Sequence, residues 1–547
     1  MTLAYTYTPE NYLKTLQSSD GSIHYQYEHD KCGRVTAVSE GNGKKTSRQY
    51  NANGQMSYEK LSNQLDFSYH YDRTGRIGYL GVGGGTGISL LYHYEGPRLK
   101  MIKRNDKTGT TLAHHVYQKW DLSGRVLWEE LSGGANRFYT YNKRGKLTSI
   151  KDPFYDVKVP EGGYCPAGTL KALQGKDSVG TIDKTFSYDA LYQLTAETGD
   201  SPHKYTVDSR KRRLSKDGEK YTHENPDAVA YDGQFHYDYD VRGNLIKKSN
   251  EVESFAYEYD ALDRLINVIK NDRQKWRYIY DAFDRRVSKE EYTFSAGIWI
   301  KAKTTNYLYQ GNDEIGAIND KMSLEEFRVL NPYSKKAVIV ELQGHAYAPI
   351  YDFTNSVTAL AERWFTGPVK ESYRYTSFGE VEFFDQAGNP LLQSNLGNNW
   401  CYSNKRTDSE TDFIYFGRRF YNPSTGAWIT RDPAGFIDGP NQYAYVHNNP
   451  MGFYDAYGLW SEDYTAVDAA LDSIDYSLTS FEIACLVMPE LAVSKGAFVA
   501  GGVALTSIKA VKCGRTVWKS RCAIRLLAQA SEKMANTARR IDKLVPN

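Results

Sequence analysis

Residues 67–77 read FSYHYDRTGRI, and this short stretch contains the pattern that decides the fold. Up to Tyr71 its residues alternate as they do in a strand with one buried face. Asp72 and Gly75 then supply residue types that form tight turns, and a second short strand begins at Arg76. The stretch therefore predicts a β-hairpin.

The same unit, an aromatic residue followed by Asp or Asn and then usually Gly, recurs along the chain. Successive units begin about 21 residues apart or about twice that, so each long interval is expected to contain a degenerate unit, such as YHYEGPRL near Tyr94. The recognisable units are HDKCGRV at His29, YNANGQM at Tyr50, YDRTGRI at Tyr71, WDLSGRV at Trp120, YNKRGKL at Tyr141, YDALYQL at Tyr188, YDVRGNL at Tyr239, YDALDRL at Tyr259 and YDAFDRR at Tyr280. Such hairpins cannot bury a face alone and must stack on their neighbours. We expect Tyr to pack between units and Asp to tie each turn, in a long coiled β-ribbon.

Composition supports a mostly β protein. The 547 residues include 45 Tyr and 45 Gly, a combination that favours strands and turns over helices. A net charge of +2 does not mark nucleic acid or an anionic membrane as the default partner of the whole chain. Neither the histidines nor the cysteines show metal-ligand spacing, so we expect no metal and no cofactor.

Four later segments resemble the end of the core of Rhs proteins. They are YLYQGNDEIGAI at Tyr307, ESYRYTSFGEV at Glu371, YFGRRFYNPSTGAWITRDPAGF at Tyr415 and NQYAYVHNNPMGFYDAYGL at Asn441. Together with the repeats they identify a resemblance to the Rhs/YD-repeat toxin family, which includes the C components of Tc toxin complexes. The resemblance implies a hollow β shell that encapsulates a toxic C-terminal domain and severs it by its own aspartyl protease activity, in a single turnover.

The resemblance also implies the site. Two pentapeptides, DPAGF at Asp432 and DAYGL at Asp455, match the family pattern whose aspartates carry self-cleavage, here after Leu459 and before Trp460. The chemistry is coherent, because two carboxylates in one site cannot both ionise cheaply, and one stays protonated while the other activates water. The alternative is that both pentapeptides only make turns.

Two further residues near the pentapeptides are candidate catalytic groups. Arg431 is predicted to hold one carboxylate ionised or to polarise the scissile carbonyl, and Asp438 is an additional carboxylate nearby. The chain departs from the family pattern at Phe436, where the family has Leu, and at Ala456, where it has Pro.

The composition changes after Leu459, where the Tyr and Gly signature stops and Ala, Leu and Ser take over. The predicted organisation is a YD-repeat shell at 1–305, a core region with the cleavage site at 306–459, and a small α-helical effector at 460–547. The predicted helices have apolar faces at Val467, Leu471, Ile474, Leu478, Phe481 and Cys485, and at Ile524, Leu527, Met534, Ala538 and Ile541.

The target of the effector is the least determined part. The apolar run GAFVAGGVALTSI, between Lys495 and Lys509, is short for a membrane span, so it favours a core helix over a membrane segment. As to the target, the run slightly favours a membrane over nucleic acid, which Lys533, Arg539, Arg540 and Lys543 leave open. The alternative is a small helical domain whose charges are only solvated. Two other functions remain: a non-catalytic YD-repeat surface or interaction protein, and a nuclease-like tail enzyme on a passive scaffold.

Partners and location follow from the resemblance and the N-terminus. The family implies a shell-completing or capping chain like the B component, a delivery apparatus and an immunity protein. The start MTLAYTYTPENYLK lacks a basic region followed by an apolar one, so no secretory signal peptide is expected. We therefore expect synthesis in the cytoplasm and export by a specialised secretion or toxin-complex route.

Overall fold

Antiparallel β-hairpins build the part of the chain that the structure, a computed structural model, describes: residues 2–83, 86–362 and 369–463. The chain divides into two compact units, Met1–Tyr464 and Thr465–Asn547. The described residues contain no α-helix and only two short 3₁₀ turns, so the prediction of a mostly β protein is confirmed. The predicted α-helical region lies outside the described residues.

Two large sheets account for most of the strands. A 21-stranded sheet contains β1 (Leu3–Tyr7), β2 (Leu13–Ser18), β3 (His24–His29), β4 (Val35–Glu40), β5 (Lys45–Tyr50), β6 (Met56–Lys60), β7 (Asp66–Tyr71), β8 (Ile77–Val82), β9 (Ile88–Glu95), β10 (Arg98–Asn105), β11 (Thr111–Trp120), β12 (Val126–Glu130), β13 (Asn136–Tyr141), β14 (Leu147–Lys151), β15 (Asp156–Lys158), β16 (Ala172–Lys176), β17 (Thr181–Tyr188), β18 (Leu194–Glu197), β19 (His203–Val207), β20 (Arg213–Lys216) and β21 (Glu219–Lys220). A 17-stranded sheet contains β22 (Thr222–Glu224), β23 (Ala228–Tyr231), β24 (His236–Tyr239), β25 (Leu245–Ser249), β26 (Ser254–Tyr259), β27 (Leu265–Lys270), β28 (Gln274–Tyr280), β29 (Arg286–Ser295), β30 (Ile298–Gln310), β31 (Asp313–Asn319), β32 (Leu324–Leu330), β33 (Ala337–Leu342), β34 (His345–Tyr351), β35 (Val357–Glu362), β36 (Val369–Tyr375), β37 (Val381–Asp385) and β38 (Pro390–Leu391).

Smaller elements follow the two sheets and contain the segments that resemble the end of the Rhs core. They are η1 (Tyr402–Asn404), β39 (Arg406–Asp408), β40 (Phe413–Tyr415), β41 (Phe420–Asn422), β42 (Ala427–Trp428), η2 (Val446–Asn448), β43 (Phe453–Asp455) and β44 (Ser461–Asp463). Strands β39 to β42 form a four-stranded sheet, and β43 pairs with β44 in a separate hairpin.

The predicted repeat unit forms the predicted hairpin. Between β7 and β8, Asp72 Oδ1 accepts the backbone N–H groups of Thr74 (2.8 Å) and Arg76 (3.0 Å), and its Oδ2 accepts Arg76 Nε at 2.7 Å. Gly75 adopts φ +85°, a left-handed conformation that a residue with a Cβ adopts only with strain. Aspartate and glycine therefore tie the turn, as the sequence predicts.

In several units the tyrosine joins its unit to the preceding one. Tyr71 donates its hydroxyl hydrogen to the carbonyl of Met56 at 2.8 Å, and Tyr94 does the same to Ile77 at 3.0 Å. The guanidinium of Arg76 lies over the Tyr94 ring, 4.1 Å from its centroid. Packing of tyrosine between units is thus confirmed, and the degenerate unit near Tyr94 is a true repeat.

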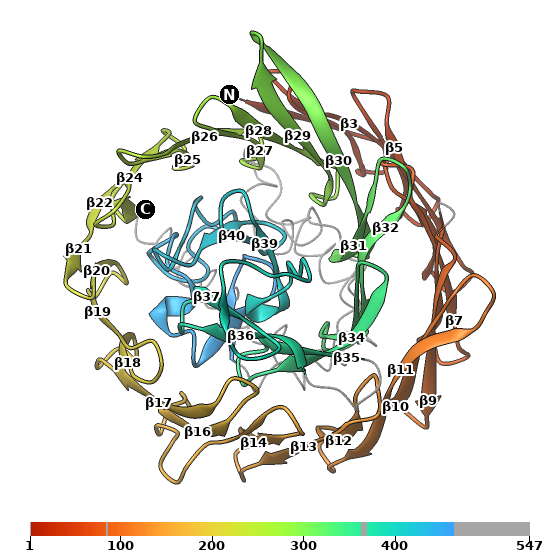
Figure 1. Cartoon of the computed structure of the whole chain (residues 1–547). Coiled ribbons are helices and arrows are strands. Elements are labelled where there is room, and N and C mark those ends of the chain that lie inside the picture. Colours follow the sequence, from red (N-terminus) through yellow and green to blue (C-terminus); the bar gives the residue numbers. More distant parts are fainter. Residues whose placement is uncertain (1, 84–85, 363–368, 464–547) are drawn as a thin grey trace, which may run out of the picture. The chain divides into compact units, whose positions relative to one another are not determined.

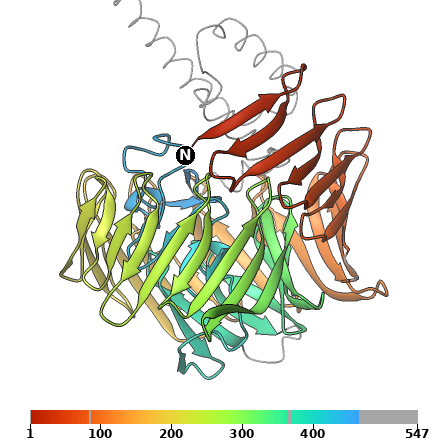
Figure 2. The same cartoon turned by 90° about the horizontal axis from the view of Figure 1, so that it is seen from above.

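Within the first unit, the strands of both sheets follow one another along a curved wall, and β36 to β40 lie on its concave side (Figure 1). Figure 2 shows the yellow-green and green hairpins of the wall side by side. The main apolar core joins the first sheet to the inward segments: it includes Phe67 and Leu90 of the wall, Ile339 of β33, and Tyr421 and Tyr445 of the core motifs.

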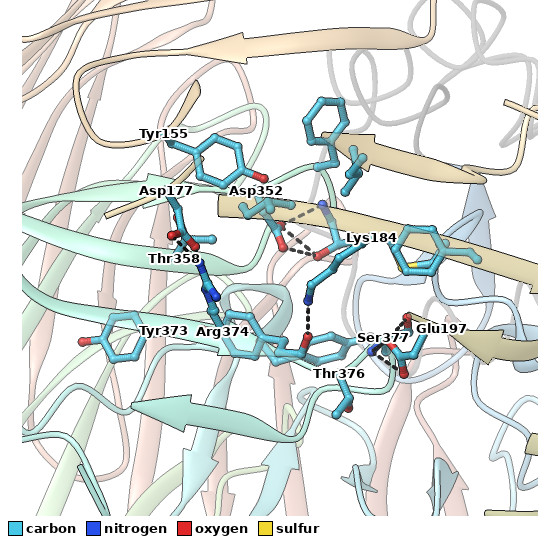
Figure 3. Close-up of a pocket in the computed structure, with 18 residues that line it drawn as sticks. Tyr155, Asp177, Lys184, Glu197, Asp352, Thr358, Tyr373, Arg374, Thr376 and Ser377 are labelled. Atoms are coloured by element: carbon cyan, nitrogen blue, oxygen red, sulfur yellow. Dashed lines mark hydrogen bonds and ion pairs between the residues drawn. The ribbon is translucent and has the colours of Figure 1, made fainter. Parts of the chain in front are cut away.

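Polar contacts also tie the wall to the inner strands (Figure 3). Around a cavity of about 60 Å³, Arg374 of β36 pairs with Asp177 at 2.8 Å, and Glu197 of β18 accepts the Ser377 hydroxyl at 2.7 Å. Lys184 of β17 donates to the carbonyl of Tyr375 at 3.0 Å. These charged groups have partners across the cavity. We therefore interpret the cavity as a place where the wall and the inner strands are joined, not as a ligand site.

Candidate active site

An aromatic cluster supports the loops that carry the two pentapeptides. Tyr402, Phe416, Tyr421, Trp428 and Tyr445 contact one another with ring centroids 4.2 to 6.4 Å apart. Four of the five belong to the motif segments that carry the family resemblance. Buried rings of this kind fix the surrounding backbone, because each ring contributes a large rigid apolar surface.

The two pentapeptide aspartates converge on one arginine. Asp432 follows β42, Asp455 ends β43, and Arg419 immediately precedes β41. Arg419 Nη2 lies 2.9 Å from Asp432 Oδ2 and 3.7 Å from Asp455 Oδ2. Residue exposures are only 7%, 3% and 2% for Asp432, Asp455 and Arg419, so the carboxylates share their cation away from water. The Arg419 guanidinium is itself held over the Trp428 ring, 4.1 Å from the centroid.

The other carboxylate oxygen of each aspartate shapes its pentapeptide. Asp455 Oδ1 accepts the backbone N–H groups of Tyr457 (3.0 Å), Gly458 (2.7 Å) and Leu459 (3.2 Å). Asp432 Oδ1 accepts that of Ala434 at 2.7 Å. Each aspartate therefore stabilises its turn through Oδ1. Its Oδ2 remains available for the separate interaction with Arg419.

Burial raises the pKa of both carboxyl groups toward neutral pH. It raises the pKa of Asp432 to about 6, against the opposing pull of the Arg419 guanidinium. It raises the pKa of Asp455 to about 7, against the same guanidinium and the three backbone N–H groups. Near neutral pH one carboxyl group can hold a proton while the other is ionised, which is the state required of an acid/base pair.

The predicted scissile bond lies in the loop of a β-hairpin. Strands β43 and β44 pair Asp455 with Ser461, which leaves residues 456–460 as the loop. Arg419 Nε donates to the carbonyl of Gly458 at 2.6 Å, and the Leu459 side chain is buried. Gly458 adopts φ +76°, and a Cβ there would approach the Arg419 backbone nitrogen to 3.1 Å. A glycine is therefore required where the loop meets the arginine.

Arg431 does not occupy the predicted place. Its Nε lies against the turn of a wall repeat, where a Cβ added to Gly243 would approach it to 2.4 Å. The arginine that contacts both carboxylates is Arg419, in the YFGRRF segment. Nothing in a single sequence distinguishes Arg419 from other arginines, because its contact with Asp455 spans 36 residues along the chain.

Asp438 lies beside the scissile loop but on its C-terminal side. Its Oδ2 accepts the Ser461 hydroxyl at 2.7 Å, and its Oδ1 accepts the Ser461 backbone N–H at 3.2 Å. The charge of Asp438 also contributes to the raised pKa of Asp432. This carboxylate therefore influences the pair while holding the residue two positions after Leu459.

Lys405 is a buried cation that sequence reasoning missed. Burial lowers the pKa of its ammonium to about 8, although nearby carboxylates including Asp313 and Asp455 act in the opposite direction. Its Nζ lies 5.2 Å from the centroid of Tyr457, in the scissile loop. Lys405 adds positive charge near Asp455 without an ion pair to it.

The two departures from the family pattern leave this geometry in place. Phe436 is 72% exposed, so its larger side chain does not enter the site. Ala456 replaces proline, but the turn forms because Asp455 Oδ1 binds three consecutive amides after it. Neither substitution displaces a residue that contacts Arg419.

The described residues contain no group of three or more His, Cys, Asp or Glu placed to hold a metal ion. No helix of sufficient length and apolarity to traverse a bilayer is found in the same part of the chain.

A wall of stacked YD hairpins that carries a two-aspartate core segment defines a YD-shell protein. Residues 179–454 match the family described as Teneurin YD-shell, and the chain belongs to this family. The resemblance to Rhs/YD-repeat toxins is thereby confirmed.

Curated relatives share parts of their length with the chain. The double-stranded DNA deaminase toxin A of Burkholderia cenocepacia (strain H111) is 24% identical over 368 residues, 62% of this chain and 24% of that protein. The toxin subunit YenC2 of Yersinia entomophaga is 40% identical over 74 residues, 14% of this chain and 8% of that protein. The crystal structure of TcdB2-TccC3-Cdc42 is 14% identical, with a TM-score of 0.48, and the match covers 86% of this chain and 30% of that one. This chain therefore spans a quarter or less of the length of these two curated relatives.

Proposed function

We propose that this chain is a toxin carrier, in which the β wall forms a shell around a C-terminal effector, residues 460–547, and cuts the chain once after Leu459. The observation that carries the proposal is the pair of buried carboxyl groups on Arg419, beside the hairpin loop that holds Leu459 and Trp460. Arg264 of the wall also pairs with two carboxylates, Asp260 and Asp284, so sharing an arginine does not by itself favour cleavage. The raised pKa values of Asp432 and Asp455, together with the hairpin loop beside them, favour cleavage over a role in turns alone.

The proposed reaction is hydrolysis by an acid/base pair. Asp432 has the lower pKa and the shorter contact with Arg419, so it is the ionised base that takes a proton from water. Asp455 carries the proton and gives it to the departing amide. The C–N bond between Leu459 and Trp460 breaks, the water oxygen bonds to the Leu459 carbonyl carbon, and the products are a carboxylate and an amine. Arg419 holds both carboxylates and the Gly458 carbonyl in one place.

The predicted partners and the export route are also part of this proposal. The relative named a toxin subunit supports a second, shell-completing chain, which the resemblance to Tc toxin C components also implies. Relatives named a DNA deaminase toxin and a probable deoxyribonuclease support nucleic acid as an effector target, beside the membrane that the apolar run favours. Export by a specialised secretion or toxin-complex route, a delivery apparatus and an immunity protein complete the proposal.

Purification of the full chain followed by a denaturing gel tests the cleavage. The expected result is a fragment of 88 residues, and its N-terminal sequence should begin WSEDY. A single intact band after prolonged incubation near pH 6.5 would overturn the proposal, and a fragment that begins elsewhere would overturn the cleavage position.

A further inference from the structure

Contacts on the two sides of the predicted scissile bond are made by different groups. On the N-terminal side, Asp455 and Arg419 hold residues 457–459. On the C-terminal side, Asp438 holds Ser461 through both of that residue's donors, at 2.7 and 3.2 Å. The contacts between Asp438 and Ser461 do not depend on the peptide bond between Leu459 and Trp460.

Asp438 is itself held by a short chain of polar groups that reaches the wall. His447 Nε2 lies 3.3 Å from Asp438 Oδ1, and Lys211 Nζ lies 2.5 Å from His447 Nδ1. Burial lowers the pKa of His447, which favours the neutral ring. A neutral ring with its proton on Nε2 can donate to Asp438 while Nδ1 accepts from the Lys211 ammonium.

The wall end of this chain is also fixed. Lys211 lies in the turn after β19, and its carbonyl accepts the side-chain amides of Asn441 (3.2 Å) and Asn448 (2.9 Å). Both asparagines belong to the core segment that carries the second pentapeptide. The contacts therefore join the wall, the loop with Asp438, and the first residues of the tail.

Strand pairing adds a second attachment to the same residues. Strand β44 pairs with β43 through Asp455–Ser461, Tyr454–Glu462 and Phe453–Asp463. Glu462 accepts the Tyr454 hydroxyl and the Trp460 indole N–H, each at 2.8 Å. All these partners lie on the shell or within residues 460–462, so hydrolysis after Leu459 removes none of them.

We propose that Asp438, supported by His447 and Lys211, anchors the segment on the C-terminal side of the cleavage point, so that the tail stays docked on β43 after hydrolysis. This inference rests on the proposed cleavage and makes cleavage and release two separate steps. Hydrolysis leaves the contacts of Asp438 with Ser461 in place and adds a positive charge at Trp460, the preceding residue. Asp438 is then a positioning residue, not half of the acid/base pair.

Hydrogen–deuterium exchange of the cleaved protein tests the anchor. In the wild type, the amides of residues 461–463 should keep their protection after cleavage. In Asp438→Ala they should exchange at least about tenfold faster, since charge-assisted hydrogen bonds to Ser461 are lost. Asp438→Asn keeps an acceptor oxygen and should lie between the two. Asp385→Ala, which removes an aspartate from an exposed turn elsewhere, is the matched control and should behave as wild type.

Two outcomes overturn the anchor while leaving the proposed cleavage intact. One is loss of protection at 461–463 as soon as the wild-type chain is cut, and the other is unchanged protection in cleaved Asp438→Ala. Failure of the proposed function has a different signature, because no 88-residue fragment would then be present on a denaturing gel.

Discussion

Asp72 of a wall repeat and the two aspartates of the candidate site make the same kinds of local contact, but their pKa values are shifted in opposite directions. In the repeat turn, Asp72 uses Oδ1 for backbone amides and Oδ2 for Arg76, four residues later. At the site, Asp432 and Asp455 also use Oδ1 for backbone amides and Oδ2 for an arginine, but both point to Arg419. In the Asp72 turn one carboxylate pairs with one arginine, whereas at the site two carboxylates pair with Arg419.

The second difference is exposure to water. The Asp72 and Arg76 side chains keep 29% and 24% of their exposure, and the pKa of Asp72 is lowered to about 2, with burial opposed by hydrogen bonds from Thr74 and Arg76. At the site burial prevails, and the pKa values rise to about 6 and 7. The comparison shows that turn geometry alone does not set the protonation state. The balance between burial, which raises the pKa, and hydrogen bonds and cations, which lower it, sets the protonation state.

The largest effect is expected from removing one carboxylate of the pair. Asp432→Asn and Asp455→Asn should each slow cleavage at least about a thousandfold, because half of the acid/base pair is lost while the asparagine can still cap the turn. Release of the 88-residue fragment over time measures it. Asp72→Asn changes the same residue type in a repeat turn and should cleave at the wild-type rate. Cleavage at the normal rate in either site variant would contradict the assignment.

Removing the arginine should lower the free energy of unfolding more at the candidate site than in a wall repeat. Arg419→Met leaves two buried carboxyl groups without their cation and is expected to lower the free energy of unfolding by about 3 to 5 kcal/mol. Arg76→Met breaks a partly exposed ion pair and should cost less than about 1 kcal/mol. Urea denaturation of both variants measures the difference. Equal losses would mean that Arg419 is no more important to the fold than a repeat arginine.

The two regions should respond to pH in opposite directions. Cleavage should be fastest between about pH 6 and 7, where one carboxyl group of the pair is protonated and the other ionised, and slower on both sides. Because both folded-state pKa values lie above the usual 3.8, the stability that these groups contribute is complete below pH 3.8 and is lost as pH rises through 6 to 7. Asp72 shows the reverse, since its contribution is present above pH 3.8 and is lost as pH falls through about 2.

A pH series of single-turnover cleavage, with unfolding midpoints measured in parallel, checks both signs. A cleavage rate that keeps rising above pH 8 would argue against a protonated carboxyl group in the reaction. The Asp455→Asn chain serves as the control for stability, because it should lose most of the pH dependence between 6 and 7.

The local sequence pattern was sufficient to predict the hairpins of the wall. It was not sufficient to predict which residues contact the two aspartates of the site. The hairpin turns and the packing of Tyr71 against the preceding unit depend on residues about 15 positions apart or fewer, and they were predicted correctly. The pentapeptide aspartates were singled out through the family resemblance. Arg419 and Lys405 were not, because their contacts with the site join segments that only the folded core brings together. His447 lies nine residues after Asp438, and no motif in the sequence marks that pair.

The error over Arg431 has the same origin. Arg431 is adjacent to Asp432 in sequence, and adjacency suggested a contact that the turn geometry does not make. Arg431 and Asp432 lie outside any helix or strand, so their adjacency fixes no common direction for the two side chains. In the structure Arg431 meets the wall repeat at Gly243 instead.

The smallest expected effect comes from restoring proline at the second pentapeptide. Ala456→Pro should raise the free energy of unfolding by about 0.4 to 1 kcal/mol, because proline reduces the conformational freedom of the unfolded chain when the native backbone accepts it. The native backbone is suited to it, since Ala456 does not adopt positive φ, and the first pentapeptide carries Pro433 at the matching position. The three amides that Asp455 Oδ1 binds belong to later residues and keep their hydrogens.

Thermal unfolding measures the gain in stability. Ala434→Pro, which removes an amide that Asp432 binds, is the matched control and should lose stability instead. A loss of stability in Ala456→Pro would show that this chain has adapted its second turn to alanine, and that the two pentapeptides are no longer equivalent.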